Sequence, residues 1–298
     1  MTKIPHGHIL GGVVTTPDLD AALADYAGTL GLRIVEQGAL AADLAASWGC
    51  AGSAGSAMAV LQPASGAPCF LRLVEQPVPP AFKPTTSYGW AAYELTVQDV
   101  FGWPDRLAGS GFAIVGPPKE LAGLPYFVPM QVLGRGQEMI YLNEVRENTP
   151  TSDLPKAASP VDHIFICILA ARDRAAACEW YRGVLGLDAG ETYTLPYSMI
   201  NNAFGLPADT LSQLTMVQNG RMTILEVDDY PPQATDRPRS PGRLPPGNAL
   251  VTLAVDNLNR PGLDWITPPA VHHGAIYAGC RSGTVLGPSG ELLELVER

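Results

Sequence analysis

The chain has 298 residues, a hydrophobic fraction of 46% and a formal net charge of −10. This length exceeds the roughly 100 to 200 residues of one domain and predicts two domains of similar size. Nucleic acid is excluded as a partner, because phosphate binding needs clustered basic residues and the chain has 19 lysines and arginines against 29 acidic residues. No apolar run approaches the about 18 residues of a membrane helix, so no membrane association is expected.

The first quarter of the chain reads as a strand, a helix and three further strands. Leucines and Tyr26 recur at helical spacing between Asp18 and Leu30, with Asp18 as the N-cap and Gly31 as the terminator. The strands predicted around this helix are Ile9 to Val14, Leu32 to Val35, Ala57 to Leu61 and Cys69 to Val74. The small residues between Gly49 and Ser56 indicate a loop.

The other quarters repeat this order of elements. The second is predicted to contain the segments Trp90 to Val97, Val100 to Leu107, Phe112 to Val115, Phe127 to Leu133 and Glu138 to Val145. The third is predicted to contain Ile164 to Leu169, a helix over Arg172 to Leu185, and strands Leu211 to Val217 and Met222 to Val227. The fourth is predicted to contain Ala249 to Val255, a short turn-like helix near Leu258 to Leu263, Trp265 to Thr267, Cys280 to Leu286 and Leu292 to Val296.

Six residues recur at a constant offset of 155 positions, which indicates an internal duplication. They are His8, Tyr26, Gly28, Leu30, Gly31 and Leu32, which return as His163, Tyr181, Gly183, Leu185, Gly186 and Leu187. A polar segment rich in proline and serine, residues 147–160, reads as the linker between the copies. We therefore predict an N-terminal half, residues 1–146, and a C-terminal half, residues 161–298. A second proline-rich joint, Pro231 to Pro246, holds Arg237, Arg239 and Arg243.

Three motifs in the second half resemble the vicinal oxygen chelate superfamily, which includes glyoxalase I, extradiol dioxygenases and the bleomycin resistance proteins. They are Val161 to Ile164, Trp180 to Leu187, and the closing segment Gly287 to Leu295. The resemblance covers nearly the whole chain. It implies an α+β fold of four βαβββ modules that form two open barrels, and it implies a metal bound by residues of the first and last strands of each module pair.

Transferred to this sequence, the resemblance implies a metal site formed by His163, Glu226 and Glu294. The last strands align as Leu71-Arg72-Leu73, Ile140-Tyr141-Leu142, Leu225-Glu226-Val227 and Leu293-Glu294-Leu295. The first half then holds His8, Arg72 and Tyr141, a degenerate site that cannot bind a metal. Leu250 stands where a fourth ligand of the second half would be, which disfavours ring-cleaving dioxygenase chemistry.

One imidazole and two carboxylates suit a divalent ion such as Zn, Mn, Ni, Co or Fe(II). Such an ion would polarise a substrate oxygen while Glu226 or Glu294 moved a proton, which is lyase or isomerase chemistry. Tyr197, Asn201 and Asn202 are predicted to contact substrate, and His273, in the loop before the strand at Cys280, could reach inward.

The alternative prediction is a metal-free binding protein of the bleomycin resistance type, in which the barrel sequesters a small molecule without chemistry. The amino terminus lacks the basic and then apolar pattern of a secretory signal, so a cytoplasmic location is expected. Four modules in one chain can form both barrels without a partner, and either a monomer or a homodimer is consistent with this count.

Overall fold

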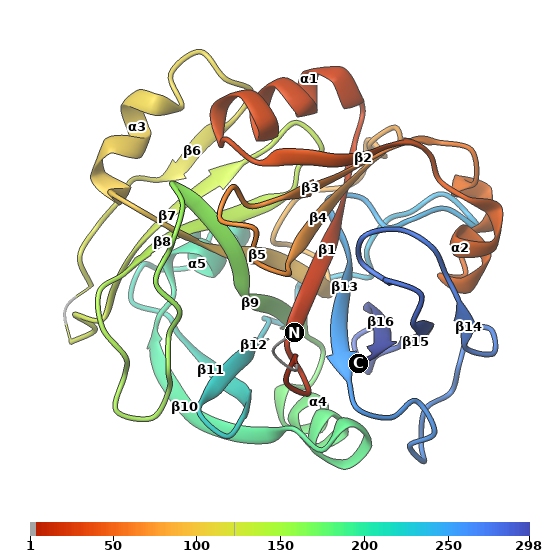
Figure 1. Cartoon of the computed structure of the whole chain (residues 1–298). Helices are drawn as coiled ribbons and strands as arrows, with labels where there is room; N and C mark the ends of the chain where they lie inside the picture. Colours follow the sequence, from red (N-terminus) through yellow and green to blue (C-terminus); the bar gives the residue numbers. More distant parts are fainter. Residues whose placement is uncertain (1–3, 122) are drawn as a thin grey trace.

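Two eight-stranded mixed sheets dominate the computed structural model, which describes residues 4–121 and 123–298 (Figure 1). The first sheet contains, in spatial order, β14 (Ala270–Val271), β15 (Arg281–Leu286), β16 (Leu292–Glu297), β13 (Asn248–Val255), β1 (Ile9–Thr16), β4 (Phe70–Glu75), β3 (Ala57–Gln62) and β2 (Arg33–Ala39). The second contains β10 (Asp188–Pro196), β11 (Leu211–Asn219), β12 (Met222–Asp229), β9 (Val161–Ala171), β5 (Gly89–Val97), β8 (Met139–Val145), β7 (Phe127–Leu133) and β6 (Ala113–Gly116).

Each sheet curls into an open barrel, which confirms the predicted fold class, but each barrel takes one module from each half of the chain. The strand β1 pairs antiparallel with β13, so the first and fourth modules share a barrel. The strand β5 pairs antiparallel with β9, so the second and third modules share the other. The expectation that each half closes its own barrel is therefore corrected, because the halves exchange modules across these two central strand pairs.

The duplicated helices begin where the sequence predicts and end in π-helical turns. The helix α1 (Leu19–Leu23) continues as η1 (Ala24–Thr29), and α4 (Arg174–Trp180) continues as η4 (Tyr181–Leu185). Asp18 accepts a hydrogen bond from the backbone N–H of Ala21 at 2.9 Å, and Asp173 caps α4 in the same way. Both caps satisfy amide groups that a helix start leaves without partners.

An acidic residue at the end of each module's last strand holds the segment that follows the first strand. Their carboxylates accept hydrogen bonds of 2.8 to 3.2 Å from backbone N–H groups: Glu75 from Leu19, Glu144 from Val100, Asp229 from Arg174 and Glu297 from Leu258. Negative charge at a helix start also interacts favourably with the helix dipole. The repeated contact fixes each connecting segment against its own sheet.

Several connecting segments differ from the predicted elements. The chain forms helices α2 (Ala42–Ser47) and α5 (Ser198–Phe204), which were not predicted, and a short 3₁₀ turn, η2 (Ala51–Ser53). The segment after β5 is η3 (Val100–Gly102) followed by α3 (Trp103–Arg106). Residues 258 to 263 form bends and turns rather than a helix, so the fourth module has lost its helix.

One continuous apolar core joins the outer faces of both sheets and the helices packed on them. Tyr93 of β5 reaches across this core and donates to the carbonyl oxygens of Val13 and Leu250, both at 2.9 Å. A Cβ atom on Gly12 would lie 2.6 Å from the Tyr93 ring, so glycine permits this close approach of the barrels. No described helix is long and apolar enough to cross a membrane.

Candidate functional site

The four aligned last-strand residues occupy equivalent register positions facing the two barrel interiors. Arg72 pairs across the ladder with Val60, Tyr141 with Gln131, Glu226 with Met216 and Glu294 with Thr284. Because the halves exchange modules, the last-strand residues of one half do not share a barrel. Arg72 and Glu294 share the first barrel, while Tyr141 and Glu226 share the second.

The interior of the first barrel is closed by a buried ion pair. An Nη atom of Arg72 lies 2.8 Å from Oε2 of Glu294, and both side chains are at most 1% exposed. Trp48 and Tyr277 donate to Oε1 of Glu294 at 2.9 and 2.8 Å, and Thr252 donates to Oε2 at 2.7 Å. Burial opposes ionisation of Glu294, but the Arg72 charge and these donors hold its pKa below the ordinary value.

A divalent metal does not fit the first barrel, because Arg72 already supplies the positive charge beside its one carboxylate. Both oxygens of Glu294 accept hydrogen bonds from side chains of the barrel. The guanidinium also lies over the Trp48 ring, 4.7 Å from its centroid. The predicted first-half site of His8, Arg72 and Tyr141 does not assemble, because Arg72 lies in the first sheet and Tyr141 in the second. Arg72 instead completes a packed interior together with Glu294.

The interior of the second barrel gathers three acidic side chains and two tyrosines. Glu94 comes from β5, Glu226 and Asp228 from β12, and Tyr141 from β8. Tyr197, immediately before α5, donates to Oε1 of Glu226 at 3.1 Å and lies 3.2 Å from the Tyr141 hydroxyl oxygen. Glu226 and Tyr197 are partly exposed, whereas Glu94 and Asp228 are 5% and 1% exposed.

Burial raises the pKa of each of these carboxyl groups. The pKa of Glu226 rises to about 7, although hydrogen bonds from Tyr197 and Asp228 lower it. The pKa values of Glu94 and Asp228 rise well above their ordinary range, first through burial and then through the nearby charge of Glu226. At neutral pH the site therefore combines neutral acids with one partly exposed carboxyl that gains and loses a proton.

Among the buried polar atoms that lack a hydrogen-bond partner in the described residues, two lie at the acidic cluster of the second barrel. They are Oδ1 of Asn143, whose amide nitrogen donates to Glu94, and Oδ1 of Asp228. Buried polar atoms are normally paired, so these two acceptors are available to a further hydrogen-bond donor.

The structure does not assemble the predicted triad of His163, Glu226 and Glu294. Glu226 lies on β12 of the second sheet and Glu294 on β16 of the first. Across residues 4–121 and 123–298, no three histidine, cysteine or acidic side chains are placed so that they could hold a metal ion. The predicted divalent ion therefore has no fitting donor set in either barrel.

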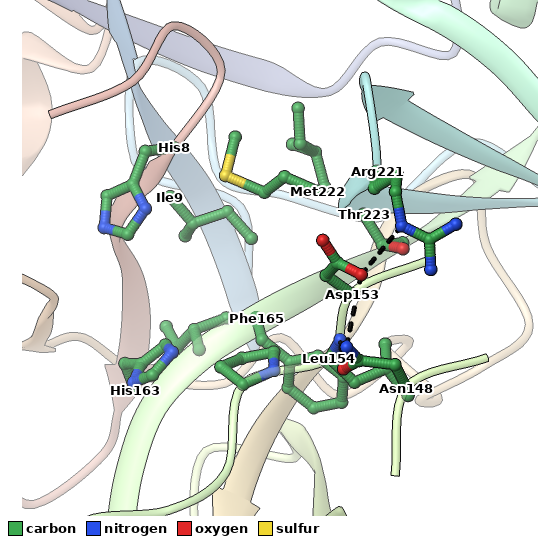
Figure 2. Close-up of a pocket in the computed structure, with 13 residues that line it drawn as sticks. His8, Ile9, Asn148, Asp153, Leu154, His163, Phe165, Arg221, Met222 and Thr223 are labelled. Atoms are coloured by element: carbon green, nitrogen blue, oxygen red, sulfur yellow. Dashed lines mark hydrogen bonds and ion pairs between the residues drawn. The ribbon is translucent and has the colours of Figure 1, made fainter. Parts of the chain in front are cut away.

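The two repeated histidines meet outside the barrels. His8 and His163 both line a cavity of about 500 Å³ at the start of β1, β9 and β12, with apolar walls that include Ile9 and Phe165 (Figure 2). Asp162 accepts from Nδ1 of His163 at 3.1 Å. Burial and the neighbouring His163 lower the pKa of His8 to about 4, so His8 is neutral at physiological pH.

Both histidines lie near strand starts, in strands whose pairing is irregular. The register between β1 and β13 shifts between Ile9 and Gly11, and the register between β5 and β9 shifts at three places. A shift of one residue moves a side chain to the opposite face of a strand. The resemblance implied a barrel site for each histidine, whereas the structure brings the two histidines together in this one cavity.

The remaining predicted ligand-binding residues occupy several separate places. Asn201 is 1% exposed and donates to the carbonyl oxygens of Ala208 and Thr210, where it holds the turn after α5. Asn202 is exposed on the same helix. His273 is exposed in the loop between β14 and β15 of the first sheet, so it does not share the barrel of Tyr197 and Glu226.

The sequence reasoning missed Glu94 and Asp228. Both lie on the strand face that points into the barrel. Glu94 pairs in register with Tyr141, and Asp228 lies two residues beyond Glu226 on the same face. The signal available was an acidic residue inside the apolar run of β5, where an unpaired charge is costly. Trp48 and Tyr277, which close the first barrel, carried no comparable signal.

No family model matches the chain, and no curated protein does. Solved structures do match over nearly the whole length. Glyoxalase I from Zea mays is 16% identical with a TM-score of 0.62, over 97% of this chain and 92% of that one. A putative dioxygenase from Bacillus subtilis is 11% identical with a TM-score of 0.63, and the match covers 99% of this chain and 86% of that one. The chain thus has the vicinal oxygen chelate fold, which confirms the resemblance at the level of architecture.

Proposed function

We propose that the second barrel binds a small oxygenated molecule and transfers a proton through Glu226, as a metal-independent isomerase or lyase. The observation that carries the proposal is the partly exposed carboxyl of Glu226, which accepts from the Tyr197 hydroxyl beside the buried acids Glu94 and Asp228. Burial raises the pKa of this carboxyl to about 7. A general base works best when its pKa lies near the working pH.

The roles follow from the protonation states. Ionised Glu226 would remove a proton from a carbon next to a carbonyl group, and its conjugate acid would return the proton at a second position. The charge that develops on the carbonyl oxygen needs hydrogen-bond donors in a site of low dielectric constant. Neutral Glu94 or Asp228 and the hydroxyls of Tyr141 and Tyr197 are the donors available.

The alternative of a metal-free binding protein is supported by other side chains of the same barrel. Met216, Gln131 and Tyr230 line or flank it and are partly exposed, which suits a molecule with apolar and polar parts. The two functions differ in whether a bound molecule exchanges a carbon-bound proton.

Proton transfer can be tested without knowing the substrate. Purified protein is incubated in D₂O with a panel of hydroxyketones, dicarbonyls and aromatic hydroxyketones, and NMR follows both binding and exchange at the carbon next to the carbonyl. We expect at least one compound to exchange, with a loss of about 10²- to 10⁴-fold in Glu226→Gln and retained binding.

The matched control is Glu144→Gln, on β8 of the same sheet, whose carboxylate accepts from the backbone N–H of Val100 outside the barrel interior. Exchange in this variant should equal that of the wild type. Binding without exchange would favour the sequestering protein, and exchange that persists in Glu226→Gln would overturn the role of Glu226.

A further inference from the structure

A second cavity, of about 180 Å³, lies where the two barrels meet, and it is lined by three arginines. Its walls come from the starts of β5 and β13, from the turn before β16 and from the proline-rich segment 231–246. Arg237 and Arg239 belong to that segment, and Arg172 follows β9. In a chain with a net charge of −10, this concentration of positive charge is a local exception.

Arg237 carries a charge that no described carboxylate neutralises. Its Nε donates to the Ser87 hydroxyl at 3.2 Å, and its Nη atoms donate to the carbonyl oxygens of Trp90 at 2.6 Å and Asn248 at 2.8 Å. Every one of these partners is neutral. Burial lowers the pKa of Arg237 to about 10, which reflects the cost of holding this cation away from water.

The other charged groups around the cavity leave a positive balance. Arg172 pairs with Asp236, and both side chains are more than half exposed. Glu291 is buried, accepts from the Tyr181 hydroxyl at 2.9 Å and has a pKa raised to about 7 by burial, so its negative charge is incomplete at neutral pH. Arg239 forms no ion pair with a described residue, which leaves Arg237 and Arg239 in excess.

Further hydrogen-bond donors face the same cavity. Ser289 is 4% exposed, and its hydroxyl oxygen accepts from the backbone N–H of Arg172 at 3.1 Å, which leaves the hydroxyl hydrogen available. The Tyr88 ring lies under the Arg172 guanidinium, 4.3 Å from its carbon, and fixes that side chain at the rim. Planar guanidinium groups and hydroxyls together match the oxygens of a phosphate group.

We propose that this cavity is a binding site for a small phosphate dianion, either inorganic phosphate or a phosphate monoester, separate from the second barrel. Arg237 contacts Trp90 of the second sheet and Asn248 of the first, so an anion on this cation would tie the two barrels together. Occupation of the site therefore stabilises the relative position of the barrels as well as neutralising the buried charge.

Isothermal titration with inorganic phosphate and with glycerol phosphate, at constant ionic strength, tests the site. We expect saturable binding with a dissociation constant below about 1 mM, weakened at least tenfold in Arg239→Ala, since a charge-assisted hydrogen bond contributes this much. Phosphate at ten times the dissociation constant should raise the melting temperature by about 2 °C. Tighter binding of the monoester would identify a phosphorylated molecule as the source, and equal binding would identify the free ion.

The matched control is Arg243→Ala, from the same proline-rich segment but outside the cavity lining. It removes the same charge and should bind phosphate like the wild type, as should Glu226→Gln. Binding that saturates only above about 10 mM, an equal loss in both arginine variants, or tighter binding of succinate than of phosphate would overturn the proposal.

Discussion

A single register position, repeated in four last strands, decides what each barrel can do. In the first barrel this position holds Arg72 and Glu294, which neutralise one another within a packed interior. In the second it holds Tyr141 and Glu226, which leave a carboxyl partly exposed and titratable near neutral pH. The two barrels therefore differ in side-chain chemistry on equivalent positions of the same backbone.

Arg72→Met should destabilise the protein by about 3 to 5 kcal/mol, because it leaves the Glu294 carboxylate buried without its cation. Urea unfolding followed by circular dichroism measures this loss. The double variant Arg72→Met with Glu294→Leu removes both charges at similar volume and should recover most of the lost stability. A single-variant loss below about 1 kcal/mol, or a double variant less stable than the single one, would contradict the role of Arg72 as an internal counter-ion.

At the scale of elements, one buried hydrogen bond ties each duplicated helix to a turn of the next module. The Tyr26 hydroxyl donates to Glu138 at 2.8 Å, and the Tyr181 hydroxyl donates to Glu291 at 2.9 Å. Each helix lies in one module and each turn in the following one, so these contacts join the barrels within each half of the chain. Burial raises the pKa of both glutamates to about 7.

These raised pKa values predict that stability falls as pH rises from about 4.5 to 7. The unfolded chain releases both protons near pH 4.3, whereas the folded chain keeps them until about pH 7. The folded state therefore loses on the order of 3 kcal/mol for each carboxyl across this window, and the loss is complete above it. The double variant Glu138→Gln with Glu291→Gln keeps an acceptor for each tyrosine but cannot titrate.

Urea unfolding at pH 4.5 and at pH 7.5 measures the effect. The wild type should lose more stability between the two pH values than the double glutamine variant does. Glu120→Gln, at an exposed carboxylate, provides the control and should follow the wild type. Equal pH dependence in the wild type and the double variant would show that the buried glutamates do not carry this effect.

Elements with strong periodicity or a clear cap could be predicted, and elements defined by tertiary contacts could not. Asp18 caps α1 as its sequence position indicates, since the cap is a local interaction. The helix α5 was missed because its polar residues lack an apolar stripe, although Met199 packs against the second barrel. The prediction of a metal site at His163, Glu226 and Glu294 failed because the two glutamates lie in different sheets, and the sequence has no signature of this exchange.

At the scale of the whole molecule, the exchange of modules makes the two halves mutually dependent. The duplication visible in the sequence suggests two independent halves, but pairing between β1 and β13 and between β5 and β9 crosses the linker. The sequence could predict the number of modules, because each has its own pattern. It could not predict which modules pair, because the first strands of all four are similar apolar runs.

This exchange predicts that neither half folds alone as a monomer. A fragment of residues 1–146 would contain β1 and β5 without their antiparallel partners, and would expose the long edges and apolar faces that β13 and β9 cover. Produced separately, each half should aggregate or form oligomers. Produced together, residues 1–152 and 153–298 should associate into a complex of one copy each with the circular dichroism spectrum of the intact chain. Size-exclusion chromatography with light scattering measures the outcome, and a single half that is monomeric and unfolds cooperatively would contradict the exchanged pairing.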